Sequence, residues 1–196
     1  MPIVEEYLDW LPRSDAERER LQSLAATQAG YFTAWQAIEL GYASTDILEL
    51  KEHVDLIADG VYRFVHYPPS DHEDLVITWL QTEKQGVFSH DTALALHELS
   101  DILPVRTHVT VPPGWKPIEG MQLSANTVVH HGNVDASEIT WMGPVPFTKP
   151  LRTLVDCIDD QLPPDILDQA LSDAYRRGML SPAELHTLQA RKAKSA

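Results

Sequence analysis

Hydrophobic positions in the first 67 residues follow the period of helices and then that of strands. Between Thr33 and Gly41 apolar residues recur at helical spacing, with a capping residue at the start and a glycine suited to a left-handed end. Ser44 begins a second helical pattern, and residues 54–64 hold two β-favouring runs joined by Asp59-Gly60, a strong hairpin signal. The order helix, turn, helix and hairpin predicts a winged helix-turn-helix domain.

The rest of the chain mixes the two periods. Tyr67-Pro68-Pro69-Ser70 ends the hairpin and marks the predicted boundary between domains 1–67 and 68–196. Apolar and polar residues alternate through 105–111, which predicts a strand with one solvated face. The other expected elements are strands at 127–131 and 139–142 and helices from 14, at 71–81, 89–99, 151–159, 164–177 and from 181. The expected fold class is α+β, with a winged helix-turn-helix domain followed by a mixed α/β C-terminal domain.

The composition is that of a globular chain with a strong excess of negative charge. Of the 196 residues 43% are hydrophobic, and 29 acidic against 15 basic side chains give a formal net charge of −14. The chain up to Tyr67 holds 12 acidic and 5 basic residues, and the remainder holds 17 and 10, so each part carries a charge of −7. Acidity is an ordinary means of staying soluble, and it also suits a surface that meets a basic partner.

Cysteine content and hydropathy bear on the cellular compartment. Cys157 is the only cysteine, which excludes an internal disulfide, and its apolar neighbours predict a buried helix position. Reducing conditions fit this composition best. No apolar run approaches the roughly 18 residues of a membrane span, and the start of the chain lacks the basic residues of a signal peptide. We therefore expect a cytoplasmic protein that does not engage a membrane.

The predicted second helix and hairpin carry the wrong charge for a surface that binds DNA. A helix-turn-helix places its second helix in the major groove, where basic or amide side chains meet phosphates and base edges. Here that helix carries Asp46, Glu49 and Glu52. The polar side chains left to contact DNA are Ser44, Thr45, Lys51, His53 and Arg63. Because phosphate affinity comes mainly from lysine and arginine, we expect weak binding unless the protein dimerises on DNA or also uses Arg18 and Arg20.

Histidines and carboxylates of the second domain raise the question of a metal or acid–base cluster. The group consists of His90, Asp91, His97, Glu98 and His108. Against it, an acidic residue beside His90 suits a helix start, and a hydrogen bond in the core explains His97. His130 and His131 are neighbours on a strand and point to opposite faces, so they make a poor chelate. With no HExxH motif, CxxC pair or glycine-rich phosphate loop, we predict no metal, no cofactor and no enzymatic activity.

Arg152 stands four residues before Asp156 on a predicted helix, which favours a structural salt bridge. If Arg152 and His90 shared one cleft, they would be able to bind a phosphate or an anionic group of a partner. We take His90, His97, Arg106 and Arg152 as the candidate partner-binding residues of the second domain.

Several short motifs occur in a fixed order over most of the chain. They are Gly30-Tyr31-Phe32-Thr33, Gly41-Tyr42-Ala43-Ser44, Asp59-Gly60-Val61-Tyr62-Arg63, Phe88-Ser89-His90-Asp91-Thr92-Ala93-Leu94, Leu103-Pro104, His108-Val109-Thr110-Val111-Pro112 and Thr148-Lys149-Pro150-Leu151-Arg152-Thr153-Leu154-Val155-Asp156. In order and spacing they resemble the AbiEi family of type IV toxin–antitoxin antitoxins. The resemblance implies a bacterial regulator whose winged domain binds the operator of its own operon. It also implies a C-terminal domain that counteracts a nucleotidyltransferase toxin, without a stable complex. Family members are usually rich in arginine in the second helix and wing, and this chain departs from that pattern.

Three functional hypotheses follow. The first is an AbiEi-like antitoxin and transcriptional autoregulator, with operator DNA and a nucleotidyltransferase toxin as partners. The alternative is a protein-interaction module that keeps the winged fold and uses its acidic helix to bind a basic protein. The third is an enzyme acting on phosphate esters or nucleic acid, for which the sequence fixes no catalytic geometry.

Overall fold

The computed structural model describes residues 15–43, 52–118 and 121–195. The fold is α+β, and the chain divides into two units. The first unit comprises the chain up to Lys84 together with residues 117–123, and the second comprises 85–116 and 124–196. None of the helices in the described ranges combines the length and the apolar character that a membrane span requires.

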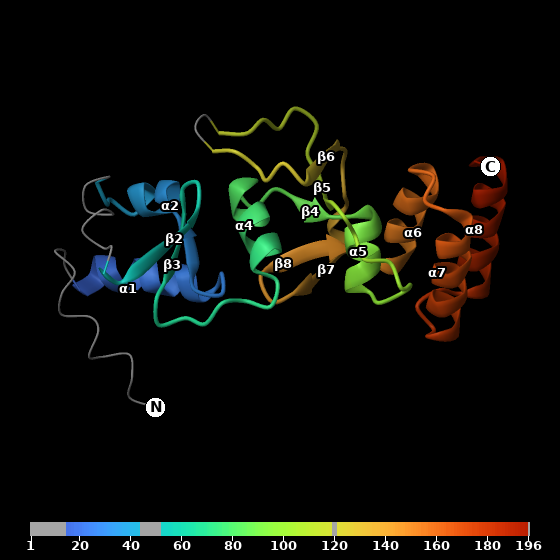
Figure 1. Cartoon of the computed structure of the whole chain (residues 1–196), viewed down its shortest axis with the longest axis horizontal. Helices are drawn as coiled ribbons and strands as arrows, with labels where there is room; N and C mark the ends of the chain where they lie inside the picture. The colour runs from blue at the N-terminus through green and yellow to red at the C-terminus, as the bar shows by residue number, and fades with distance from the viewer. Residues whose placement is uncertain (1–14, 44–51, 119–120, 196) are drawn as a thin grey trace. The chain divides into compact units, whose positions relative to one another are not determined.

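In the described part of the first unit, three helices lie around a small antiparallel sheet (Figure 1). Its elements are α1 (Asp15–Ala26), β1 (Tyr31–Thr33), α2 (Ala34–Glu39), β2 (Val54–Ala58), β3 (Val61–Phe64) and α4 (Glu73–Gln81). The strands follow the order β1-β3-β2, and β2 and β3 form a hairpin. Thr33 caps α2 by accepting a hydrogen bond from the Gln36 N–H, and Gly41 has a left-handed φ of 95°, so both predictions are confirmed.

Aromatic and aliphatic side chains fill the space between this sheet and its helices. The buried members of this core are Leu21, Ala25, Phe32, Ala37, Tyr42, Val54 and Phe64. Gly30 permits the chain to enter β1, because its φ is 91° and a Cβ there would lie 2.3 Å from Cγ of Tyr67. The predicted hairpin strands are present, whereas β1 was not predicted.

The first unit extends further along the chain than the predicted boundary after Tyr67. Helix α4 packs on β1 and β3, and Leu75, Val76 and Leu80 are buried on it. The carboxylate of Glu73 at the start of α4 accepts a hydrogen bond from the hydroxyl of Tyr31 in β1. These contacts join α4 to the N-terminal sheet, although the sequence placed it in the second domain.

The second unit contains a five-stranded mixed sheet. Its elements are β4 (Val87–Phe88), α5 (His90–Leu96), β5 (Thr107–Val111), β6 (Thr127–His131), the 3-10 helix η3 (Ala136–Glu138), β7 (Ile139–Met142), β8 (Val145–Thr148), α6 (Pro150–Asp159), α7 (Pro164–Arg176) and α8 (Pro182–Ser195). The strand order is β6-β5-β4-β8-β7. β4 pairs parallel with β8, β5 pairs parallel with β6, and the other two pairs are antiparallel. The central strand β4 and its neighbour β8 were not predicted.

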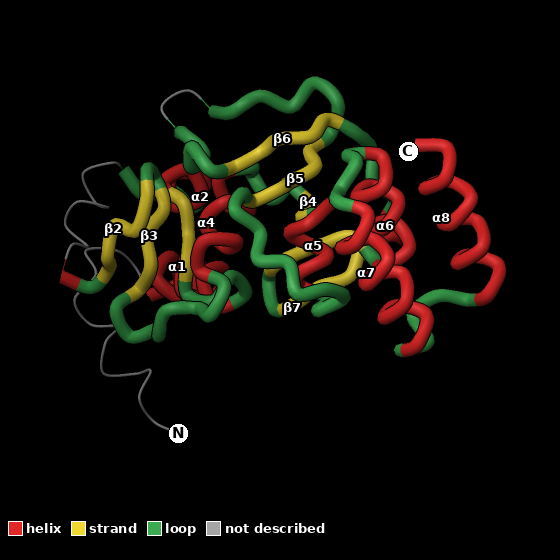
Figure 2. Tube along the Cα trace, turned by 45° about the vertical axis from the view of Figure 1, so that its right-hand side comes forward, coloured by secondary structure: helices red, strands yellow, loops and turns green. Residues whose placement is uncertain are grey.

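Helices lie in layers beside this sheet (Figure 2). α5 packs on β5 and α6, and α6 in turn contacts α7 and α8. Cys157 is buried in the core between these helices, as predicted. The prediction of a solvated face on β5 is wrong, because Thr110 is buried and the side chain of His108 is nearly so. The polar side chains of this strand face α5 rather than water.

Candidate functional site

Of the predicted DNA-binding residues, Ser44, Thr45 and Lys51 lie outside the described residues. His53 immediately precedes β2 and is half-buried, and this burial lowers the pKa of its imidazole. At neutral pH His53 therefore adds no positive charge beside the hairpin.

Arg63 on β3 is held by two carboxylates. Its guanidinium donates to Asp55 Oδ2 at 3.1 Å and to Glu73 Oε1 at 3.0 Å, and its side chain is only 12% exposed. The guanidinium carbon also lies 5.8 Å from the centre of the Tyr31 ring. These contacts raise the pKa of Arg63, with Tyr31 as the largest cause. Arg63 is thus a structural cation whose charge is already neutralised.

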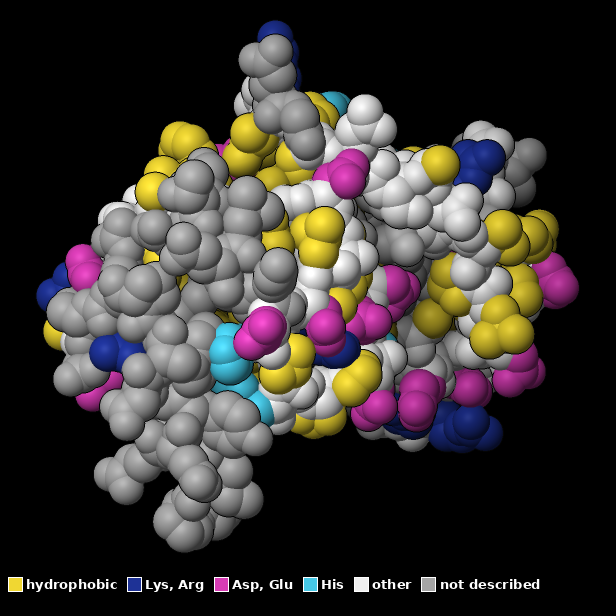
Figure 3. Space-filling view, turned by 60° about the vertical axis from the view of Figure 1, so that its left-hand side comes forward, with side chains coloured by type: hydrophobic (Ala, Val, Ile, Leu, Met, Phe, Trp, Pro, Cys, Tyr) yellow, Lys and Arg dark blue, Asp and Glu magenta, His cyan; other side chains and the backbone are white. Residues whose placement is uncertain are grey.

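Other cations of the described surface are scattered. Figure 3 shows lysine and arginine side chains at separate points of one face, with acidic side chains spread between them. Arg20 on α1 is exposed, whereas Arg18 is buried. On the face shown, the described residues form no continuous basic patch.

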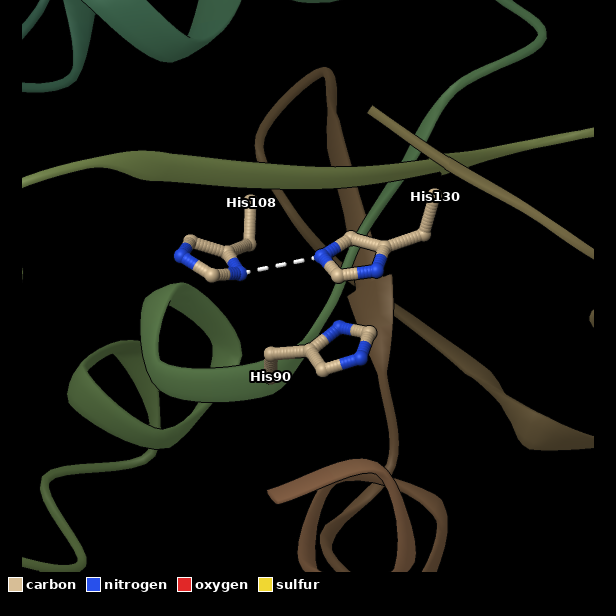
Figure 4. A group of neighbouring side chains, drawn as sticks. All are labelled: His90, His108 and His130. Carbon is tan, nitrogen blue, oxygen red and sulfur yellow. Dashed lines mark hydrogen bonds between the residues drawn. The ribbon is translucent and has the colours of Figure 1, made fainter. Parts of the chain in front are cut away.

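Three histidines meet in the second unit (Figure 4). His90 begins α5, His108 lies on β5 and His130 lies on β6. His108 and Thr110 share one face of β5, and Thr110 is paired with His130, so parallel pairing puts His108 and His130 on the same face of the sheet. The backbone N–H of Ser89 donates to the His108 carbonyl at 3.1 Å, which brings His90 beside them.

The three rings are in direct contact. Nδ1 of His108 and Nε2 of His130 are 3.0 Å apart, and the rings of His90 and His130 stack with centroids 3.7 Å apart. Nδ1 of His90 lies 2.8 Å from the hydroxyl of Ser89, which in turn lies 2.7 Å from the hydroxyl of Thr110. One ring nitrogen from each histidine lies within 4.8 Å of the other two.

The carboxylate of Asp91 lies beside the imidazole of His108. Its Oδ1 lies 3.4 Å from Nε2 of His108 and has no hydrogen-bond partner in the described parts of the chain. The hydroxyl of Thr92 accepts from the His108 N–H at 2.8 Å, which fixes this strand against the start of α5. A buried carboxylate facing an imidazole N–H is the arrangement that orients a metal-binding histidine.

Burial dominates the electrostatics of the cluster. It lowers the pKa of His90 to about 3, with smaller contributions from the charges of His130, His108 and Arg152. Burial also lowers the pKa of His130 and raises that of Asp91. His90 and His130 are therefore neutral at neutral pH, which is the form of imidazole that binds metals.

The backbone of His90 has an unusual conformation. Its φ of 54° lies in the left-handed region, which costs a non-glycine residue on the order of 1–3 kcal/mol. The hydroxyl of Ser89 bonds within the cluster and does not cap α5. Asp91 lies in the first turn of α5, so the expected position of an acidic residue at this helix start is confirmed.

The other members of the predicted cluster lie apart from it. Nε2 of His97 contacts the carbonyl oxygen of Thr148 at 2.8 Å, and its ring packs against Phe147. Burial lowers the pKa of His97, and Glu98 is exposed. The seven-residue spacing between His90 and His97 does not align them, because α5 runs only from His90 to Leu96.

The two predicted partner-binding arginines differ. Arg152 donates to Asp156 at 2.8 Å and to Glu138 at 2.9 Å, which confirms the expected helix-face salt bridge. Its charge nevertheless lowers the pKa of His90, so Arg152 lies within electrostatic reach of the cluster. Arg106 is exposed in the loop before β5.

His130 is the member of the cluster that sequence reasoning missed. His130 and His131 do point to opposite faces, and that alternation leaves one of them on the face that carries His108. The alternation of side chains on the strand therefore indicates that one of the two histidines lies on that face. Only the pairing of β5 with β6 shows that this histidine is His130.

Comparison with known proteins gives a structural similarity but no family. No family model and no curated protein matches the sequence. Among solved structures, the chain is similar to the RV2827C protein from Mycobacterium tuberculosis at 18% identity, with a TM-score of 0.47, over 91% of this chain and 82% of that chain. This likeness carries no argument about function.

Proposed function

We propose that the protein is a transcriptional regulator of the AbiEi antitoxin type, whose first unit is a winged helix-turn-helix domain that binds the operator of its own operon. The observation that carries the proposal is the order of elements in that unit. α1, β1 and α2 precede residues 44–51, and the hairpin β2–β3 follows them, with β1 beside β3. This order matches that of a winged domain whose second helix is the one that the sequence pattern predicts from Ser44.

Charge limits how tightly such a domain binds DNA. Arg63 is neutralised by Asp55 and Glu73, and Arg18 is buried, which leaves Lys51 and Arg20 as the phosphate-binding cations that we propose. Each phosphate contact releases counterions and adds affinity, so two contacts per chain give weak binding unless two chains act together. Ser44, Thr45 and His53 add neutral hydrogen-bonding groups to this surface.

The second part of the proposal is that the C-terminal unit counteracts a nucleotidyltransferase toxin. The motif order described above supports it. Leu103, Val105 and Arg106 are exposed in one loop, which offers a partner both apolar contact and a charge. His97 and Arg152 make their contacts within the unit, His97 with Thr148 and Arg152 with Asp156 and Glu138.

A gel mobility shift with DNA from upstream of the gene tests the first part. At low salt we expect a shift that a scrambled fragment of equal length does not give, and Lys51→Ala weakens it. Absence of a shift at low salt, where phosphate attraction is strongest, would contradict DNA binding. Co-expression with a nucleotidyltransferase encoded next to the gene tests the second part, since the antitoxin should restore growth.

One observation favours the alternative function, a module that binds a basic protein. On the hairpin, Arg63 is paired internally with Asp55, while Leu56 and Asp59 are exposed. An exposed apolar side chain near an exposed acid suits a basic partner better than a phosphate backbone. Pull-down with the wild type and with an Asp46, Glu49 and Glu52 charge-reversed variant distinguishes the two, and equal recovery of partners by both forms counts against the alternative.

A further inference from the structure

We infer that His90, His108 and His130 form a binding site for a divalent transition metal ion, with zinc as the occupant that fits best. The three rings come from α5, β5 and β6 and converge on one region of the second unit (Figure 4). One nitrogen from each ring lies within 4.8 Å of the other two. The three histidines belong to the second unit, whereas the hairpin belongs to the first, and the inference does not depend on DNA binding.

The distances are close to those of a tetrahedral zinc site. Zinc binds imidazole nitrogen at about 2.0–2.1 Å, so two nitrogens on one tetrahedral ion lie about 3.3 Å apart. The pair formed by Nδ1 of His108 and Nε2 of His130 is already at 3.0 Å. The His90 ring stacks on His130 at an interplanar angle of 14°, so it must turn out of the stack for its lone pair to meet the same ion. That turn is a side-chain rotation and leaves the strands in place.

The ligand type selects the metal. Three imidazoles favour zinc, copper, iron or nickel, whereas magnesium and calcium require oxygen ligands. Three protein ligands also leave a fourth tetrahedral position for water or an anionic group, as in zinc sites that act on a substrate. The site therefore binds zinc in preference to magnesium and remains open to a small ligand.

Asp91 is placed to accept a hydrogen bond from the metal-binding histidine His108 and so to orient its ring. Its Oδ1 is buried, faces Nε2 of His108 at 3.4 Å and has no hydrogen-bond partner in the described ranges. When His108 binds a metal through Nδ1, its Nε2 carries the proton and donates to this carboxylate. Metal binding thus provides the buried oxygen with the partner that it lacks.

The surrounding charge is compatible with a divalent cation. Neutral imidazoles add no charge, so nearby carboxylates must offset that of the ion. Besides Asp91, the negative charges of Asp159 and Asp160 act on His90 and His130 respectively. Arg152 opposes them but is paired with Asp156 and Glu138, and Asp159 is itself paired with Arg191, so Asp91 and Asp160 are the carboxylates that offset the ion.

The experiment uses the untagged full-length protein, stripped with a chelator and dialysed. Zinc is titrated by calorimetry in the presence of excess magnesium, and cobalt is titrated by visible absorption, which reports tetrahedral coordination. We expect one ion per chain and an intense tetrahedral cobalt spectrum. His108→Ala and His130→Ala should each weaken zinc binding by about 100-fold or more, and Asp91→Asn by about 10- to 100-fold.

His131→Ala is the matched control. It removes the neighbouring histidine, which is exposed on the opposite face of β6, and should bind zinc like the wild type. Circular dichroism of each metal-free variant checks folding, and His130→Asn replaces the alanine variant if that one unfolds. Absence of stoichiometric zinc binding by the wild type, or equal affinity in the folded His130 and His131 variants, would overturn the inference and identify the cluster as a hydrogen-bonded group of imidazoles.

Discussion

Arg63→Ala tests whether this residue is a structural cation of the first unit. The change removes the hydrogen bonds to Glu73 and Asp55, whose side chains are 34% and 51% exposed. A hydrogen bond between charged groups contributes about 1.5–3 kcal/mol, and a largely exposed ion pair at most about 1 kcal/mol. We therefore expect Arg63→Ala to lower the free energy of unfolding by about 2–4 kcal/mol.

Urea denaturation followed by circular dichroism measures this difference. Arg176→Ala is the control, because Arg176 is 73% exposed and its pair with Asp173 joins neighbouring turns of one helix. It should cost no more than about 0.5 kcal/mol. In double-mutant cycles the coupling of Arg63 with Glu73 should exceed that with Asp55. If Arg63→Ala and Arg176→Ala have equal stability, Arg63 does not hold the fold together.

Three further predictions concern single residues. Gly30→Ala should lower the free energy of unfolding by about 3 kcal/mol or more, because it combines left-handed strain with a clash against Tyr67. Gly114→Ala, at a φ of 88° in open space, should lower it by about 1–2 kcal/mol, and thermal unfolding compares the two variants. Cys157 should resist a thiol reagent in the folded protein and react after unfolding, since burial raises its pKa; equal rates in both states would contradict this. Burial and the carboxylate of Glu73 raise the pKa of Tyr31 above 10.0 in the folded protein. The stability that protonated Tyr31 contributes is therefore complete below pH 10.0 and is lost as the pH rises through the raised pKa. The ultraviolet titration of the wild type minus that of Tyr31→Phe measures this pKa, and an ordinary value would refute the burial argument.

Local signals in the sequence predicted local structure. Thr33, Gly41 and the turn at Asp59-Gly60 act through their own backbone neighbours, and the elements they bound are where the pattern placed them. By contrast, β1 spans three residues and β4 spans two, and both are strands because they pair with distant segments. The residues next to β1 and β4 in the sequence do not show which distant strand each of them pairs with.

The candidate site depends on the same distinction. The sequence pattern alone predicts that Arg63 contacts DNA. In the structure α4 packs on β3 and places Glu73 beside Arg63, which pairs with it. His90 and His108 were identified because each lies in a recognisable element, whereas His130 joins them through a parallel strand pair. Pairing over such a distance is set by the packed core and not by the residues beside each histidine.

The salt dependence of binding to the upstream DNA tests the central claim most directly, namely that a winged first unit holds DNA with few cations. Anisotropy titrations of the full-length protein at several salt concentrations give the slope of log K against log salt concentration. Two phosphate contacts per chain predict a slope of about −2 for each bound chain. A slope near −6 or steeper, or no sequence-selective binding even at low salt, would contradict the account.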